Sequence, residues 1–333
     1  MANSSHPMAT VLLLQNPDEV RPEEIKAIRE MAPDYDIWLT RDPMKEDPER
    51  ISEVEISTGF TPPLELILNG RLRWNHAFSA GMDWLFKIEN RLELPVLLTN
   101  SSGIHAIPIS EHIFAMILAH DRTLIKTIRN QSKGIWEGTV PGAPMETIAG
   151  KTMLILGLGA IGERVAKLAQ AHDMHVLGIR RQPERTCEWV DEMHGPQDMD
   201  KLLPRADYVV CILPKTPDSH HIIGQPQIDL MKPGVFIANV GRGMHIDENA
   251  LIAALQNGKV RGAGLDTFET EPLPADSPFW EMENVIISPH CAGDQPDYCF
   301  EARRLFLKNL KRFMAGEPLI NVVDKELGYS LTH

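Results

Sequence analysis

Cysteine and long apolar runs are both scarce in this chain of 333 residues. The four cysteines form no CxxC pair and no spacing typical of zinc ligands, which argues against a disulfide framework and predicts free thiols and no metal centre. No apolar run reaches the roughly 18 residues of a membrane span, and the N-terminal segment has no signal-peptide pattern. We therefore expect a cytoplasmic protein that does not bind membranes.

Positive charge is scarce as well. Lys and Arg number 33 against 46 Asp and Glu, which gives a formal net charge of −13 at pH 7. So acidic a surface disfavours binding to nucleic acid or to anionic lipid over its whole extent. An anionic ligand therefore needs a local basic site.

Residues 151–162, KTMLILGLGAIG, combine an apolar run with three spaced glycines. Residues 153–156 are typical of a buried strand, and the following ERVAKLAQAH has the periodicity of a helix. This order predicts a dinucleotide site: Gly157 permits the turn, Gly159 lets a pyrophosphate approach the backbone, and Gly162 lets helix and strand pack closely. The helix N-terminus would offer N–H groups to the phosphates. A glycine-rich turn without a nucleotide is the alternative at this point.

Strand-like and helix-like segments alternate along most of the chain, which predicts an α/β protein. Six strands expected between residues 153 and 289 favour a doubly wound parallel sheet, a Rossmann domain. An amphipathic helix at 298–316 is expected to pack back on the first part of the chain. We therefore predict a Rossmann domain, residues 102–294, inserted in a smaller, discontinuous, flavodoxin-like substrate domain, residues 1–101 and 295–333.

A long helix and a loop are expected between the two parts. Residues 110–131, SEHIFAMILAHDRTLIKTIRNQ, predict one continuous helix with Ser110 as its N-cap. The Gly- and Pro-rich residues 134–150 predict a loop.

Ionisable residues follow three of the predicted strands. Arg242 lies between two glycines after VFIANV. Glu269 and Glu271 follow GAGLDTF, and His290 follows NVIISP. Ligands of such sheets bind beyond the carboxyl ends of the strands, an Arg matches a carboxylate with two parallel hydrogen bonds, and a His beside a carboxylate serves as a general acid or base. A surface Arg, a solvated acidic loop and a capping His are the alternatives.

Ordered blocks along the chain resemble the D-isomer-specific 2-hydroxyacid dehydrogenases, especially their glyoxylate/hydroxypyruvate reductase branch. The blocks are SAGMD (79–83), TNSSGIHAIPISEH (99–112), GLGAIG, LPKTPDSHHIIG (213–224), NVGRG, GAGLDTFETEPLP (262–274), SPFW (277–280), SPHCAG (288–293) and GEPLINVVD. Together, in this order, they are far more specific than the glycine motif alone.

The resemblance implies roles for the residues at the strand ends. Arg242 falls on the family's substrate-binding Arg, Glu271 on its catalytic Glu, and His290 on its proton donor. Ala80 and Gly81 match a loop whose backbone N–H groups hold the substrate carboxylate. A small 2-keto acid held in this way would accept hydride from the reduced nicotinamide and a proton from His290. Glyoxylate and hydroxypyruvate are the favoured substrates, and the family also implies a homodimer.

The glycine turn and the resemblance together define an expected coenzyme site. Asp266 matches the acid that contacts the nicotinamide carboxamide in the family. The residues expected to bind the coenzyme are Gly157, Gly159, Ala160, Ile161, Gly162, Arg180, Arg181, Pro214, Val240, Gly241, Asp266, His290 and Gly293.

The end of the second Rossmann strand indicates which coenzyme is preferred. NAD enzymes usually carry an acid there for the ribose 2′-OH, whereas this chain has Arg180 and Arg181. Two guanidinium groups supply counter-charge for a 2′-phosphate, so NADPH is expected as the preferred coenzyme, with NADH possible. The alternative is that one or both arginines face solvent.

Other functions fit the chain less well. A nucleotide-sensing corepressor on the same fold, or an NAD-dependent dehydrogenase for bulkier 2-keto acids, remains open. The formate dehydrogenase type pairs its His with Gln, which Glu271 disfavours. A nucleophilic Cys291 is disfavoured because it neighbours His290 on an extended segment, where adjacent side chains point apart.

Overall fold

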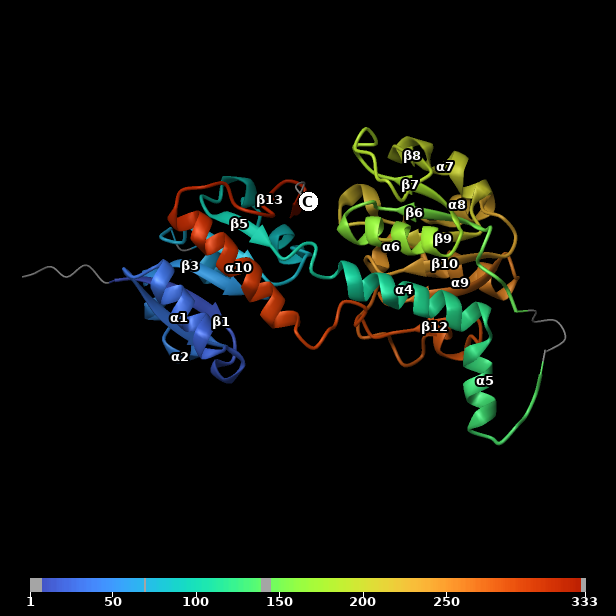
Figure 1. The fold of residues 1–333 in the computed structure, drawn as a ribbon, viewed down its shortest axis with the longest axis horizontal. Helices are drawn as coiled ribbons and strands as arrows, with labels where there is room; N and C mark the ends of the chain where they lie inside the picture. Colours follow the sequence, from blue (N-terminus) through green and yellow to red (C-terminus); the bar gives the residue numbers. More distant parts are fainter. Residues whose placement is uncertain (1–7, 69, 139–144, 331–333) are drawn as a thin grey trace, which may run out of the picture. The chain divides into compact units, whose positions relative to one another are not determined.

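The computed structural model describes residues 8–68, 70–138 and 145–330, and the chain divides into two compact units (Figure 1). Unit 1 consists of Met1–Ile104 and Pro296–His333, and unit 2 of His105–Gln295. The sequence had placed these boundaries after residues 101 and 294. Residues 139–144 of the predicted loop lie outside the described residues.

Unit 1 is built on a parallel sheet of five strands in the order β2-β1-β3-β4-β5. The strands are β1 (Ala9–Leu14), β2 (Tyr35–Thr40), β3 (Val54–Gly59), β4 (Trp74–Ala77) and β5 (Leu97–Asn100), and the helices are α1 (Pro22–Met31), α2 (Pro43–Glu46), α3 (Leu64–Leu68) and α10 (Tyr298–Met314). A short antiparallel pair, β13 (Val323–Asp324) and β14 (Tyr329–Ser330), follows α10. This strand order is typical of the flavodoxin-like fold, which the sequence predicted for this domain.

Helix α10 is part of the core of unit 1, although it comes from the far end of the chain. Arg303 on α10 donates to Glu24 on α1 at 2.7 Å, and both side chains are buried. The ring of Phe306 stacks on Trp74 of β4 with a centroid distance of 5.2 Å. A buried ion pair and a stacked aromatic pair therefore hold α10 to α1 and to β4.

Unit 2 is built on a parallel sheet of seven strands in the order β12-β11-β10-β9-β6-β7-β8. The strands are β6 (Thr152–Leu156), β7 (His175–Ile179), β8 (Glu192–His194), β9 (Tyr208–Cys211), β10 (Val235–Asn239), β11 (Val260–Leu265) and β12 (Val285–Ile287). The helices are α4 (Ala106–Asp121), α5 (Leu124–Gln131), α6 (Ala160–Ala171), α7 (Met199–Leu202), α8 (Gln225–Leu230) and α9 (Glu248–Gln256). The doubly wound Rossmann arrangement is confirmed, but the predicted six strands are seven. Strand β8 was missed because it is a half-buried edge strand of three residues without an apolar run.

Alternate residues of the central strands enter two separate cores. Leu154 and Leu156 of β6 join one cluster, whereas Met153 and Ile155 join the other. This is expected for a parallel sheet covered by helices on both faces, and it leaves the carboxyl edge of the sheet for ligands.

The predicted long helix is two helices. Helix α4 begins at Ala106, so Ser110 is not its N-cap but a buried residue whose hydroxyl donates to the carbonyl of Ile107. Thr123 adopts a left-handed conformation with φ of 54°, which ends the first helix and starts α5 in a new direction.

Candidate functional site

The glycine turn between β6 and α6 has the geometry of a phosphate-binding turn. Gly157 has a φ of +104°, and a Cβ there would lie 2.6 Å from the carbonyl oxygen of Ile212. A Cβ on Gly162 would lie 2.4 Å from the carbonyl oxygen of Gly157. Gly159 is the N-cap of α6, and Ala160 and Ile161 are the first two residues of this helix. Because the first N–H groups of a helix have no acceptor within it, this end of α6 suits a pyrophosphate, and the residues fit a dinucleotide.

Arg180 and Arg181 follow β7 directly but differ in their surroundings. The Arg180 side chain is only 9% exposed, and its Nη1 donates to Oε1 of Glu163 and to the carbonyl of Arg185, both at 3.1 Å. Arg181 is exposed. The sequence treated the two as equivalent and missed Glu163, although an acid directly after the third glycine was a visible signal.

Asp266, just beyond β11, shapes the loop that carries His290. Its Oδ1 accepts hydrogen bonds from the hydroxyl of Ser288 at 2.6 Å and from the N–H of Cys291 at 3.0 Å. Its Oδ2 accepts the N–H of Ala292 at 3.0 Å, and its carbonyl accepts the N–H of His290 at 2.9 Å. The side chain predicted to contact the nicotinamide is therefore also the anchor of the 288–292 loop.

His290 and Glu271 form a hydrogen-bonded pair at the end of this loop. Nδ1 of His290 lies 2.8 Å from Oε2 of Glu271. His290 has a φ of +53°, a conformation uncommon for a residue other than glycine. Its side chain is about half exposed, at 49%. Because Glu271 holds Nδ1, the other ring nitrogen, Nε2, is the one left to exchange a proton with a ligand.

Arg242 is held in a tight turn after β10. Its N–H donates to Nδ1 of His245 at 3.1 Å, and its carbonyl accepts from the side chain of Asn239 at 2.9 Å. A Cβ on Gly243 would lie 1.8 Å from the carbonyl carbon of Phe268, so this turn is pressed against the segment that leads to Glu271. The sequence missed both Asn239 and His245.

His105 is buried at the start of α4, near Arg242. Its ring packs on Gly293, where a Cβ would lie 3.0 Å from Cδ2. Burial, and next the positive charge of Arg242, lower the pKa of His105 to about 4. It is therefore neutral at physiological pH.

The other predicted positions in unit 2 lie at the same edge of its sheet. Pro214 follows β9, and Val240 and Gly241 follow β10 directly. The N–H of Val240 donates to the carbonyl of Cys211 at 3.2 Å, and that of Gly241 donates to Oδ1 of Asn239 at 3.1 Å.

Ala80 and Gly81 lie in unit 1, in the loop after β4. Their carbonyls are held in place: the side chain of Asn100 donates to the carbonyl of Ala80, and the hydroxyl of Ser79 donates to that of Gly81, both at 2.7 Å. Fixed carbonyls fix the peptide planes, so the N–H groups of this loop have defined directions.

Comparison with known proteins identifies the family. The family model described as the D-isomer specific 2-hydroxyacid dehydrogenase NAD binding domain matches residues 114–292. The chain belongs to the D-isomer specific 2-hydroxyacid dehydrogenase family. This dehydrogenase is 33% identical over 260 residues to a glyoxylate/hydroxypyruvate reductase B of Pectobacterium carotovorum, covering 77% of this chain and 80% of that protein.

Two solved structures show the same similarity. A D-isomer specific 2-hydroxyacid dehydrogenase of Xanthobacter autotrophicus, solved with NADPH and MES, has a TM-score of 0.80 and 29% identity and covers 96% of this chain and 99% of its own. An NADPH-dependent glyoxylate/hydroxypyruvate reductase of Sinorhizobium meliloti, solved with NADP and sulfate, has a TM-score of 0.77 and 26% identity, with coverages of 96% and 100%. The resemblance, the enzyme class and the fold predicted from the sequence are confirmed: the dehydrogenase is an NAD(P)-dependent oxidoreductase.

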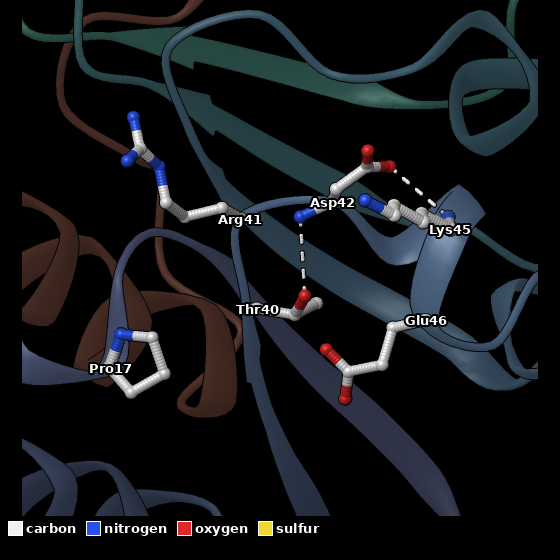
Figure 2. Close-up of a pocket in the computed structure, with 6 residues that line it drawn as sticks. All are labelled: Pro17, Thr40, Arg41, Asp42, Lys45 and Glu46. Atoms are coloured by element: carbon white, nitrogen blue, oxygen red, sulfur yellow. Dashed lines mark hydrogen bonds between the residues drawn. The ribbon is translucent and has the colours of Figure 1, made fainter.

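Unit 1 of the dehydrogenase also has a hollow. Figure 2 shows its lining, and its volume is about 480 Å³; it is lined by Pro17, Thr40, Arg41, Asp42, Lys45 and Glu46. Its two basic and two acidic side chains balance each other and are exposed. The backbone N–H of Lys45 donates to the side chain of Asp42 at 3.1 Å. No residue predicted for the substrate or the coenzyme lines this hollow.

Other chemistry considered from the sequence has less support in the dehydrogenase. Burial raises the pKa of Cys291, so its thiol is a poor nucleophile. The ring of His221 is held by an acid, with Nε2 2.6 Å from Oε1 of Glu269. Within the described ranges, no group of three or more His, Cys, Asp or Glu side chains could hold a metal ion, and no helix is long and apolar enough to cross a bilayer.

Proposed function

We propose that this dehydrogenase reduces small 2-keto acids, with glyoxylate or hydroxypyruvate as favoured substrates, to D-2-hydroxy acids with NADPH. The observation that carries the proposal is the pair formed by His290 and Glu271, with Nδ1 and Oε2 2.8 Å apart, on a loop anchored by Asp266. The Arg242 turn, which approaches the segment before Glu271, supplies the cation for a carboxylate.

Each residue has a distinct part in the proposed reaction. The guanidinium of Arg242 and the N–H groups of Ala80 and Gly81 bind the substrate carboxylate. The glycine turn at 157–162 would hold NADPH, which would supply the hydride for the carbonyl carbon. Nε2 of His290 donates a proton to the carbonyl oxygen, and Glu271 orients the ring and stabilises its protonated form.

The proposed NADPH preference rests on Arg181 and Arg180. Arg181 is exposed at the end of β7, where a coenzyme of this fold places its adenosine ribose. Arg180 contributes less charge, because Glu163 is its partner at 3.1 Å. A kcat/KM for NADH equal to or above that for NADPH would contradict this part of the proposal.

The proposed homodimer is supported by apolar side chains exposed on and after α5. Leu124, Ile128, Ile135 and Trp136 are all exposed in the single chain. Exposed apolar side chains gathered on one segment are typical of an interface between subunits. Light scattering coupled to size exclusion tests this, and a monomer in dilute solution would refute it.

A cytoplasmic location is proposed from the cysteines. Cys187, Cys211, Cys291 and Cys299 are all free thiols, which suits a reducing compartment. Cell fractionation of the native source tests it.

One panel of initial rates tests the proposed reaction. The purified protein is assayed with NADPH and with NADH against glyoxylate, hydroxypyruvate, pyruvate, phenylpyruvate and 2-ketoisocaproate. The proposal requires the highest kcat/KM with glyoxylate or hydroxypyruvate. Higher values with phenylpyruvate or 2-ketoisocaproate would instead indicate a dehydrogenase for bulky substrates.

A further inference from the structure

His245 is a fully buried histidine that the proposed reaction does not use. It ends the short turn Gly243–His245 after β10 in unit 2. Both of its ring nitrogens have a backbone partner: Nδ1 lies 3.1 Å from the N–H nitrogen of Arg242, and Nε2 lies 3.3 Å from the carbonyl oxygen of Pro214. The ring therefore bridges the segments that follow β9 and β10.

The partners of His245 determine its protonation. An N–H group can donate only to a ring nitrogen with a lone pair, so Nδ1 carries no proton. The proton lies on Nε2, which donates to the carbonyl of Pro214. In this arrangement the imidazole is neutral, with one acceptor facing Arg242.

The ring of His245 packs directly on backbone. A Cβ on Gly241 would lie 2.8 Å from Nδ1 of His245 and 2.9 Å from the carbonyl oxygen of Leu213. On the other side of the turn, Gly243 leaves no room for a side chain against Phe268. The turn that carries Arg242 thus packs between the segment at Leu213 and the segment at Phe268.

His245 makes two hydrogen bonds to the backbone of Arg242. Nδ1 accepts the Arg242 N–H, and the backbone N–H of His245 donates to the Arg242 carbonyl at 3.1 Å. The side chain of Asn239 also donates to this carbonyl, at 2.9 Å. We propose that His245 is a positioning residue that fixes the backbone of Arg242 and thereby directs its guanidinium toward the carboxylate of the substrate. This inference rests on the proposed role of Arg242.

Two amide variants separate the two hydrogen bonds of the ring. In His245→Asn, Oδ1 takes the place of Nδ1 and can still accept the Arg242 N–H, but the link to Pro214 is lost. In His245→Gln, the longer amide reaches toward Pro214, but the acceptor for Arg242 is lost. The measurements are KM and kcat for glyoxylate, the Kd of the keto acid analogue oxamate by calorimetry, and the melting temperature. The matched control is His220→Gln, because His220 is exposed.

We expect His245→Gln to raise KM and the oxamate Kd about tenfold with a smaller change in kcat, because it leaves a buried N–H without an acceptor. His245→Asn is expected to stay within about threefold of the wild type, because its acceptor is retained. Equal effects of the two variants, or an unchanged KM in the Gln variant, would overturn the role of His245. If His245→Gln does not fold, the Asn variant decides alone: a tenfold rise in its KM refutes the inference. A wild type that neither reduces a 2-keto acid nor binds oxamate refutes the proposed function itself.

Discussion

Glu271 holds His290 through one oxygen and the protein backbone through the other. Oε2 lies 2.8 Å from Nδ1 of His290, and Oε1 accepts the N–H of Phe268 at 3.0 Å. The bond to Phe268 fixes the carboxylate relative to the end of β11, and the carboxylate in turn orients the imidazole of His290. Because this carboxylate is held in place, changes at either Glu271 or His290 are expected to slow the proposed proton transfer.

Replacing His290 by Asn is expected to lower kcat by about 10²- to 10⁴-fold, because it removes the proposed general acid. Glu271→Gln should lower kcat less, since the imidazole is retained and only its negative partner is removed. Stopped-flow rates with glyoxylate measure both effects. The control is NADPH binding by fluorescence, which should change little in either variant, and turnover of His290→Asn at the wild-type rate would refute the mechanism.

The unequal surroundings of Arg180 and Arg181 predict unequal effects on coenzyme choice. Arg181→Gln should lower kcat/KM for NADPH about 10- to 100-fold, the loss expected for a hydrogen bond between charged groups, and leave NADH within about threefold. Arg180→Gln should change the NADPH to NADH ratio less, because Glu163 already partners its charge. The ratio of the two kcat/KM values checks this, with Glu163→Gln as the matched variant. A larger loss of preference in Arg180→Gln would reverse the assignment.

Buried histidines predict a loss of stability in acid. Burial lowers the pKa of His76 to about 3, and its ring contacts the hydroxyls of Thr99 at 2.8 Å and Ser101 at 3.2 Å. Between pH 6.5 and about 3 the unfolded chain binds a proton that the folded chain does not. The free energy of unfolding should therefore fall with decreasing pH in this window, by up to about 1.4 kcal/mol per pH unit from this group.

Urea unfolding at several pH values between 7 and 4 measures this slope. His105, with its pKa lowered to about 4 by burial and by Arg242, should add to it over a narrower window. His76→Gln removes one titrating group and should flatten the slope, even if it lowers stability at pH 7. An unchanged slope in that variant would show that other groups dominate acid unfolding.

A buried ionic network at the end of α4 predicts a large mutational cost. Asp121 is fully buried, pairs with Arg261 and accepts the hydroxyl of Tyr208 at 2.6 Å. Burial opposes its ionisation, but hydrogen bonds from His120, Arg261 and Tyr208 outweigh burial and lower its pKa to about 2. Asp121→Asn should lower the free energy of unfolding by about 3–5 kcal/mol, because it leaves Arg261 without its charge partner.

Tyr208→Phe is the matched control for this network, with an expected cost of about 1 kcal/mol for one hydrogen bond. Urea unfolding at pH 7 compares the two variants. Similar losses in both would mean that the ion pair contributes no more than the hydroxyl.

The sequence predicted those parts of the fold that depend on local pattern. Strand β6 and helix α6 lie where their patterns placed them, because an apolar run and helical periodicity on either side of the glycine turn mark them clearly. The break at Thr123 was not predictable, since it accompanies contacts of Asp121 with residues 87 and 140 positions away. Strand β8 exists only because β7 offers it an edge.

In the candidate site, too, features that depend on local sequence could be predicted, and contacts between distant parts of the chain could not. Arg242, Glu271 and His290 could be named from their positions after strands and from the resemblance. The hydrogen bond between His245 and Pro214 could not, because Pro214 lies 31 positions away along the chain and becomes a neighbour of His245 only when β9 and β10 pair. The partnership of Arg180 with Glu163 likewise depends on the helix start being folded beside the end of β7.

The three hydrogen bonds accepted by the side chain of Asp266 alter how variants at that position should be understood. A neutral or shortened side chain there would release the backbone at Cys291 and Ala292, and the imidazole of His290 would move with it. A low rate in an Asp266 variant would thus be consistent with a displaced His290, the proposed proton donor, as much as with the loss of the proposed contact to the nicotinamide. If His290 is the proton donor proposed above, its position depends on a carboxylate that need not exchange a proton itself.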